Sequence, residues 1–177
     1  MKSIEEQMST YAAYHQDPRN KATHFVGVPV IVLSLFIPLA WLRLGDVSAA
    51  VLLAAAVIVY YLLLDVPLGL AMLVVFALLA WIGEQIAMQG AVAGWSWFAL
   101  LFVGGWILQL VGHVYEGRRP ALADNLFQIF VAPIFLAAEV FFALGYKPAL
   151  QQRVQERAAA LRAASSGAHT APTAPSS

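Results

Sequence analysis

The chain has 177 residues, of which 61% are hydrophobic and 11% charged, with ten basic residues, ten acidic residues and no cysteine. Ordinary globular domains carry about 25% charged residues, and a soluble domain of this size could not cover so much apolar surface. The composition excludes a soluble domain, a disulfide-rich secreted scaffold and a disordered chain, and the balanced charge disfavours nucleic-acid binding. It indicates an integral membrane protein.

Residues 1–24 are expected to form a cytoplasmic amphipathic helix followed by a turn. Ser3 and Glu6 have the spacing of a capping box, in which a serine caps the helix and a glutamate follows three residues later. Apolar side chains recur on one face of this helix, and His15 lies at the end of that face. Residues 17–20, Asp-Pro-Arg-Asn, are typical of a turn, so the helix is expected to end there.

Five apolar stretches of 16 to 19 residues follow. At about 1.5 Å per residue, each approaches the ~30 Å hydrocarbon core of a bilayer once its flanking residues are added. None alternates polar and apolar residues, so we expect helices. The stretches are Phe25–Leu42, Ser48–Leu64, Pro67–Ile82, Trp95–Gly112 and Leu126–Leu144.

The basic residues predict the orientation. If the fifth stretch enters and returns, or lies along the membrane, nine of the ten basic residues face the cytoplasm and only Arg43 lies outside. We therefore expect an all-α, polytopic transmembrane bundle over residues 25–144, with four full spans and an irregular or re-entrant fifth segment. Both termini are expected in the cytoplasm. The Ala-rich composition and short loops favour a bacterial inner membrane, or the endoplasmic reticulum if the protein is eukaryotic.

The C-terminal region divides into two parts. Residues 145–164 have a charged helical pattern. Residues 165–177 are rich in Ser, Ala, Pro and Thr and are expected to form a disordered tail. His169 falls in that tail and is not a candidate for a functional site.

Three of the four histidines lie near the ends of helices in the same leaflet: His15, His24 and His113. The turn after His15 can bring this residue toward His24. Three imidazoles suit a borderline-hard transition metal such as iron, zinc or manganese, and the lack of cysteine argues against an iron–sulfur or thiolate site. The alternative, that these histidines bind no metal, stays open at this point, because a single interfacial histidine is ordinarily a hydrated anchor.

Two stripes of polar residues support an interior site, since polar groups near a membrane bundle are costly unless they are paired or hydrated. One stripe shares a helix face with His113, and the other follows across the next loop. Alternatively, the last carboxylate only pairs with one of two loop arginines, which ordinarily determine topology, or with a neighbouring helix. The stripes are Gln109, His113 and Glu116, then Asn125, Gln128 and Glu139, and the arginines are Arg118 and Arg119.

With these residues identified, the chain resembles a family of small membrane proteins typified by the yeast endoplasmic-reticulum 2-hydroxy fatty acid dioxygenase and formerly catalogued as a domain of unknown function. The resemblance covers about residues 10–145, although residues 43–94 match only in hydrophobicity. It rests on two blocks, which are specific together: Tyr14-His15, Asn20 and His24–Pro29; and Gln109–His113, Glu116, Arg118, Pro120–Leu122, Asp124–Leu126, Gln128–Pro133 and Glu139.

The resemblance implies an iron(II)-dependent enzyme that uses O₂ to shorten 2-hydroxy fatty acids by one carbon. His15, His24 and His113 would be the iron ligands. Glu116 would orient an imidazole, or act as the base or a fourth ligand. Substrate carboxylate would be held by Arg118 or Arg119. The residues expected to surround the ligands are Asn20, Gln109, Asn125, Gln128 and Glu139.

Two other functions are alternatives for a small membrane protein with several histidines. Di-iron hydroxylases and desaturases of the histidine-box type need more histidines than the four present here. A small transporter, or an ion- or proton-conducting protein, predicts charged residues deep in several spans. Only Glu139 lies well inside an apolar stretch, which favours a reactive site near the membrane surface. The expected partners are therefore a 2-hydroxy fatty acid, O₂ and membrane lipid, with no nucleic acid.

Overall fold

The computed structural model describes residues 2–117 and 127–168. Within these ranges the chain forms seven helices and one antiparallel two-stranded hairpin, in agreement with the predicted all-α fold. In chain order the elements are α1 (Ile4–Ala13), α2 (Pro18–Trp41), β1 (Arg43–Leu44), β2 (Val47–Ser48), α3 (Ala49–Leu64), α4 (Val66–Ala87), α5 (Ala91–Glu116), α7 (Gln128–Ala143) and α8 (Pro148–Ala168).

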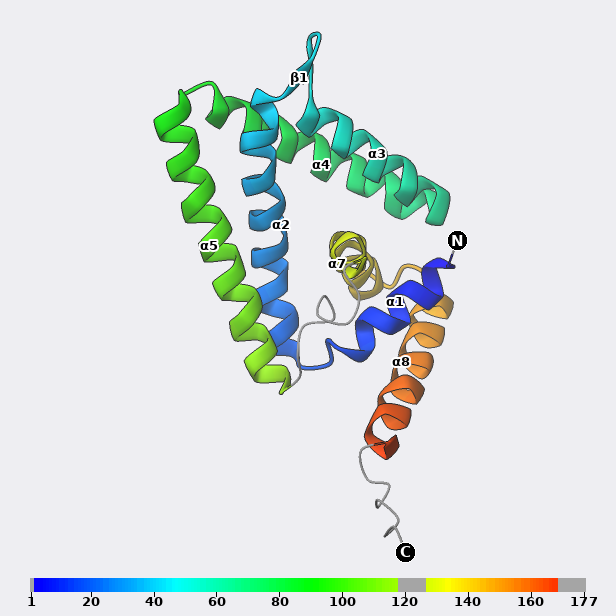
Figure 1. Ribbon diagram of the computed structural model, residues 1–177. Helices are drawn as coiled ribbons and strands as arrows, with labels where there is room; N and C mark the ends of the chain where they lie inside the picture. The colour runs from blue at the N-terminus through cyan, green and yellow to red at the C-terminus, as the bar shows by residue number, and fades with distance from the viewer. Residues whose placement is uncertain (1, 118–126, 169–177) are drawn as a thin grey trace, which may run out of the picture.

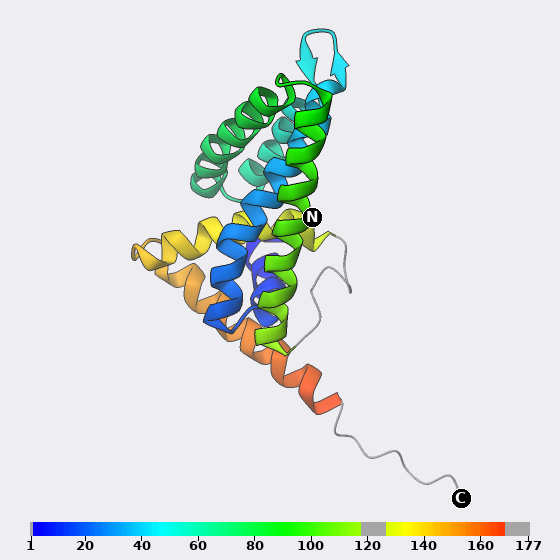
Figure 2. The same cartoon turned by 90° about the vertical axis from the view of Figure 1, so that its left-hand side faces the viewer.

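The two long helices α2 and α5 run antiparallel, side by side, along the molecule (Figures 1 and 2). The α3–α4 hairpin packs near the β1 end of α2 and diverges from α5 (Figure 1). At the opposite end of the molecule, α1 and α8 lie against each other. α7 runs across the molecule, roughly perpendicular to α5 (Figure 2).

Three of the described helices, α2, α4 and α5, are long and apolar enough to cross a membrane. α3 and α7 have 16 residues each, about 24 Å at 1.5 Å per residue, which is short of the ~30 Å hydrocarbon core. Four full spans are therefore not confirmed. The fifth apolar stretch corresponds mostly to α7, whose crosswise direction is compatible with a segment that lies along the membrane.

Two predicted boundaries are wrong. α2 begins at Pro18, not at Phe25, because Asp17 caps it: Oδ1 of Asp17 accepts a hydrogen bond from the Arg19 backbone N–H at 2.8 Å. Proline suits the first helical position, so this Asp-Pro pair starts a helix where a turn was predicted. At the other end of the chain, α8 extends to Ala168, so residues 165–168 are helical. The remainder of the predicted tail lies outside the described residues.

Glycines allow α2 and α5 to approach closely. A Cβ atom added to Gly105 would lie 2.6 Å from Cγ1 of Ile31 and 3.2 Å from the carbonyl oxygen of Gly27 on α2. A Cβ atom added to Gly112 would lie 2.2 Å from Oγ1 of Thr23 on α2. Small residues at a helix interface let backbones come together; the sequence predicts this role for Gly104, Gly105 and Gly112, and a Cβ added to Gly104 meets nothing within 4 Å. This close packing places the first turns of α2 beside the last turns of α5.

α1 is fixed by an apolar core and by ion pairs. Ser3 caps this helix as predicted, with its Oγ 3.2 Å from the Glu6 backbone nitrogen. Met8 and Tyr11 belong to a buried cluster that includes α7 and α8 side chains. At the surface, Nε of Arg153 on α8 lies 2.7 Å from Oε2 of Glu5. The amphipathic helix is therefore held against α7 and α8, with His15 just beyond its end.

Candidate metal centre

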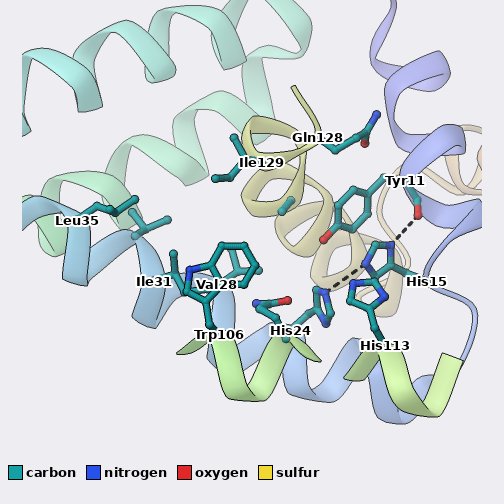
Figure 3. Close-up of a pocket in the computed structure, with 13 residues that line it drawn as sticks. Tyr11, His15, His24, Val28, Ile31, Leu35, Trp106, His113, Gln128 and Ile129 are labelled. Carbon is teal, nitrogen blue, oxygen red and sulfur yellow. Dashed lines mark hydrogen bonds between the residues drawn. The ribbon is translucent and has the colours of Figure 1, made fainter. Parts of the chain in front are cut away.

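Three histidines from separate helical segments meet in the interior (Figure 3). His15 follows α1, His24 lies in the second turn of α2, and His113 lies in the last turn of α5. They are 1%, 3% and 7% exposed, and their ring centroids are 4.7 to 5.1 Å apart. One nitrogen from each ring lies within 4.8 Å of the other two. The structure thus brings together all three histidines that the sequence singles out.

Backbone carbonyls orient two of these rings. Nδ1 of His15 lies 2.8 Å from the carbonyl oxygen of Tyr11, and Nδ1 of His24 lies 2.9 Å from that of Asn20. A carbonyl oxygen only accepts, so Nδ1–H donates in both cases and Nε2 of each neutral ring keeps its lone pair. Burial first, and the nearby His24 second, lower the pKa of His15 to about 3. His15 is therefore neutral at physiological pH, with Nε2 available as a ligand.

The candidate ligand nitrogens lie close enough together for one shared metal ion to draw them in. Nε2 of His15 and Nε2 of His24 are 3.2 Å apart, and two lone pairs at this distance repel unless they share a proton or a metal ion. Two nitrogens about 2.1 Å from one ion, at roughly right angles, lie about 3 Å apart. Nδ1 of His113 is buried with no hydrogen-bond partner in the described part of the chain. Three neutral imidazoles suit a borderline transition metal such as iron(II).

Glu116 ties the His15 segment to the end of α5. Its Oε2 atom accepts hydrogen bonds from the backbone N–H groups of Gln16 and Asp17, at 2.9 and 2.8 Å, and from Nδ2 of Asn20 at 3.2 Å. The side chain of Glu116 is only 1% exposed. Because Gln16 directly follows His15, the carboxylate fixes the backbone beside that histidine. This arrangement favours a positioning role for Glu116.

Arg162 brings α8 to the same carboxylate. Its Nη1 atom lies 2.6 Å from Oε1 of Glu116 and 3.3 Å from the carbonyl oxygen of Ala13, at the end of α1. Arg162 thus neutralises a buried carboxylate and joins α1, α5 and α8. Sequence reasoning missed this residue, because it is one of several charges on a charged helix and lies 46 residues from Glu116.

Tyr11 is a second residue that sequence reasoning missed as part of the site. Its ring stacks on His15, with centroids 3.9 Å apart and planes within 4° of parallel. Its hydroxyl points toward the middle of the cavity beside the histidines (Figure 3). Burial raises the pKa of this phenol, which therefore stays protonated. The sequence placed Tyr11 only on the apolar face of α1, where a tyrosine is expected to serve packing.

A largely apolar cavity begins at the histidines (Figure 3). It contains about 640 Å³ of atom-free space, including its part that is open to solvent. Among the described residues that line it, none is a lysine or an arginine. They are Tyr11, His15, His24, Val28, Ile31, Val32, Leu35, Trp106, Gln109, His113, Gln128, Ile129 and Ala132.

The other predicted site residues divide into three groups. Gln109 and Gln128 line this cavity, whereas Asn20 holds His24 and Glu116 through its carbonyl and amide. Glu139 does not line the cavity, and its Oε2 atom lies 2.8 Å from Nζ of Lys21 on α2. This contact with a neighbouring helix is one of the two pairings predicted for Glu139. The other, with Arg118 or Arg119, cannot be placed because both arginines lie outside the described residues, as does Asn125.

Comparisons with known proteins point to one family. A family model described as "2-hydroxy-palmitic acid dioxygenase Mpo1-like" matches residues 1–144, a range that ends after α7 and before α8. The chain is 34% identical to the 2-hydroxy-palmitic acid dioxygenase MPO1 of Saccharomyces cerevisiae over 157 residues, which are 86% of this chain and 87% of the yeast protein. No solved structure matches the chain.

Proposed function

Because this chain belongs to the 2-hydroxy-palmitic acid dioxygenase Mpo1-like family, we propose that it is an iron(II)-dependent membrane dioxygenase that shortens 2-hydroxy fatty acids by one carbon. The reaction balances as one 2-hydroxy acid and one O₂ giving the fatty acid one carbon shorter, CO₂ and water. The observation that carries the proposal is the buried cluster of His15, His24 and His113, whose candidate ligand atoms lie within 4.8 Å of one another.

The histidines would hold the iron on one side and leave its other positions open toward the cavity. When bound, iron(II) supplies the redox chemistry that O₂ needs to react with an organic acid, and it polarises the oxygens of that acid. The protein contributes the orientation. The carbonyls of Tyr11 and Asn20 hold two rings so that Nε2 faces the site, and Glu116 fixes the backbone next to His15.

The cavity suits the hydrocarbon part of a fatty acid. From His24 its lining follows α2 through Val28 and Ile31 to Leu35, eleven residues further, a rise of about 16 Å. One leaflet contributes about 15 Å of the hydrocarbon core, so the lining is as long as one acyl chain in a leaflet. Arg118 or Arg119 remains our proposal for the group that holds the substrate carboxylate.

We also propose a multi-pass inner-membrane protein with cytoplasmic termini. Nine of the ten basic residues lie in the two terminal segments and in the loop after α5, and their excess on one side of the membrane supports this orientation. The histidine cluster would then lie at the cytoplasmic side of the membrane, where a fatty acid could enter from the bilayer and water-soluble products could leave.

The experiment is product analysis with purified full-length protein loaded with iron(II) without air. Given 2-hydroxypalmitic acid and O₂, we expect pentadecanoic acid, with one O₂ consumed per product molecule. The His113→Ala variant should form no product, whereas His169→Ala, at a histidine outside the cluster, should match the wild type. Absence of product with iron-loaded wild type would reject the proposed function, whereas normal turnover by His113→Ala would remove His113 from the site.

A further inference from the structure

The cavity beside the histidines contains polar groups that the protein itself does not use. The first is the hydroxyl of Tyr11. Two other tyrosines show the usual pattern: the hydroxyl of the buried Tyr61 donates to the carbonyl oxygen of Phe130 at 2.7 Å, and that of the half-buried Tyr60 donates to Gln7. Among the described residues, the hydroxyl of Tyr11 has no hydrogen-bond partner, although the residue is only 4% exposed.

The second group is the amide of Gln109. Its side chain lines the cavity, the residue is 7% exposed, and Nε2 is buried with no partner in the part of the chain that the structure describes. Gln109 precedes His113 by one helical turn on the same face of α5. Nε2 would lie 2.8 Å from a Cβ atom added to Gly27, so the amide lies against α2 one turn after His24.

A buried donor without a partner is rare in native proteins, and the Gln109 amide, together with the Tyr11 hydroxyl beside the same cavity, indicates a ligand that accepts hydrogen bonds. Trp106 Nε1 is a third such donor, but it lies two turns from His113, beside Val28 and Ile31 in the apolar part of the cavity (Figure 3). Tyr11 and Gln109 are therefore the donors nearest to the histidine end of the cavity.

Resting on the proposed function, we propose that Tyr11 and Gln109 recognise the oxygen atoms at the 2-hydroxy acid end of the substrate and select 2-hydroxy acids over unsubstituted fatty acids. An ionised carboxylate accepts hydrogen bonds only, and the 2-hydroxyl oxygen provides a further acceptor. A fatty acid without this hydroxyl leaves one buried donor unpaired. Sites built to bind a substrate hydroxyl discriminate strongly against the analogue that lacks it.

The test measures binding without metal, because iron would itself favour a chelating 2-hydroxy acid. Full-length, metal-free protein in lipid nanodiscs is titrated with 2-hydroxypalmitic acid and with palmitic acid, each displacing a fluorescent fatty acid. Wild type should bind the 2-hydroxy acid more tightly. Tyr11→Phe and Gln109→Leu should each weaken binding of 2-hydroxypalmitic acid by roughly 2- to 12-fold and change that of palmitic acid less.

Thermal stability separates recognition from a structural role. Tyr11→Phe keeps the ring stacked on His15 and removes a hydroxyl that has no protein partner, so the melting temperature should stay within error of wild type. Gln109→Leu removes a buried unpaired amide and should leave the melting temperature unchanged or raise it. The control, Tyr61→Phe, loses a bond to Phe130 and should lower the melting temperature without changing the preference for the 2-hydroxy acid.

The outcomes distinguish this inference from the proposed function. If iron-loaded wild type turns over 2-hydroxypalmitic acid but both variants keep the wild-type binding preference, the recognition role is wrong and the function stands. Equal binding of the two acids by metal-free wild type, or no binding of either, also contradicts the role. If wild type prefers the 2-hydroxy acid but forms no product with iron and O₂, the recognition role stands and the reaction is wrong.

Discussion

Two of the three imidazoles at the centre depend on a backbone group that fixes their direction. His15 and His24 both use the carbonyl oxygen of the residue four positions earlier, at 2.8 and 2.9 Å. Such bonds to the second ring nitrogen set the tautomer and hold a ligand in place before metal binds. Little additional conformational entropy is lost in forming these hydrogen bonds, because each carbonyl belongs to the same chain segment as its histidine.

Glu116→Gln tests whether the carboxylate acts by positioning. The amide oxygen can replace only part of a carboxylate that accepts from two backbone N–H groups, from Asn20 and from Arg162. We expect metal affinity to fall roughly 10- to 100-fold, without complete loss, in a titration of the purified protein with iron(II). Complete loss would indicate a direct ligand, and unchanged affinity would show that these contacts do not serve the site.

At this scale the sequence predicted the histidines well, because buried imidazoles in an apolar chain are conspicuous. It did not predict Tyr11 or Arg162 as part of the site. A tyrosine on the apolar face of a helix has the same pattern whether it packs or faces a cavity. The contact between Arg162 and Glu116 depends on how α8 packs against α1, which no local pattern contains.

Among the elements, the α2–α5 pair is the most sensitive to side-chain size. Gly105 faces α2, whereas a Cβ added to the neighbouring Gly104 meets nothing within 4 Å. Gly105→Ala should therefore destabilise the protein by about 1–3 kcal/mol through overpacking, and Gly104→Ala should be neutral. Thermal unfolding in the same detergent compares the two. Equal melting temperatures would contradict the close approach of these helices at Gly105.

α8 contributes to the site from beyond the range of the family match. Arg162→Ala should weaken metal binding up to roughly tenfold, because Glu116 loses its charged partner and α1 loses a bond at Ala13. Arg153→Ala is the matched control on the same helix, since its pair with Glu5 is largely exposed and such pairs contribute about 0–1 kcal/mol. If metal titrations give the two variants equal affinities, α8 has no special role at the site.

Element boundaries were harder to predict than element types. The cap at Asp17 and the proline after it favour both a turn and a helix start, and only the packing of α2 against α5 distinguishes them. The second apolar stretch is a helix of 16 residues, since residues 43–48 form the β-hairpin before it. The hydropathy pattern alone could not decide whether this short helix crosses the membrane.

For the whole molecule, the orientation in the membrane is open to a direct test. The chain has no cysteine, so single cysteines can be introduced without removing native ones. Cysteine at the exposed position Asp46, in the β-hairpin, should react with an impermeant maleimide added to intact cells. Cysteine at Ser3 or Gln152 should react only after permeabilisation, because basic residues concentrate at that end. Labelling of Ser3→Cys in intact cells would contradict the proposed orientation and place the N-terminus outside.

One metal ion held by three histidines at the end of a helical bundle is the central feature of the proposed enzyme. Its most direct test is the iron content per chain after anaerobic iron(II) loading, compared for wild type and the His15→Ala, His24→Ala and His113→Ala variants. We predict one iron per wild-type chain and loss of most of it in each variant, because each loses one of the three clustered imidazoles. Wild-type iron content in any two of the variants would contradict the shared site.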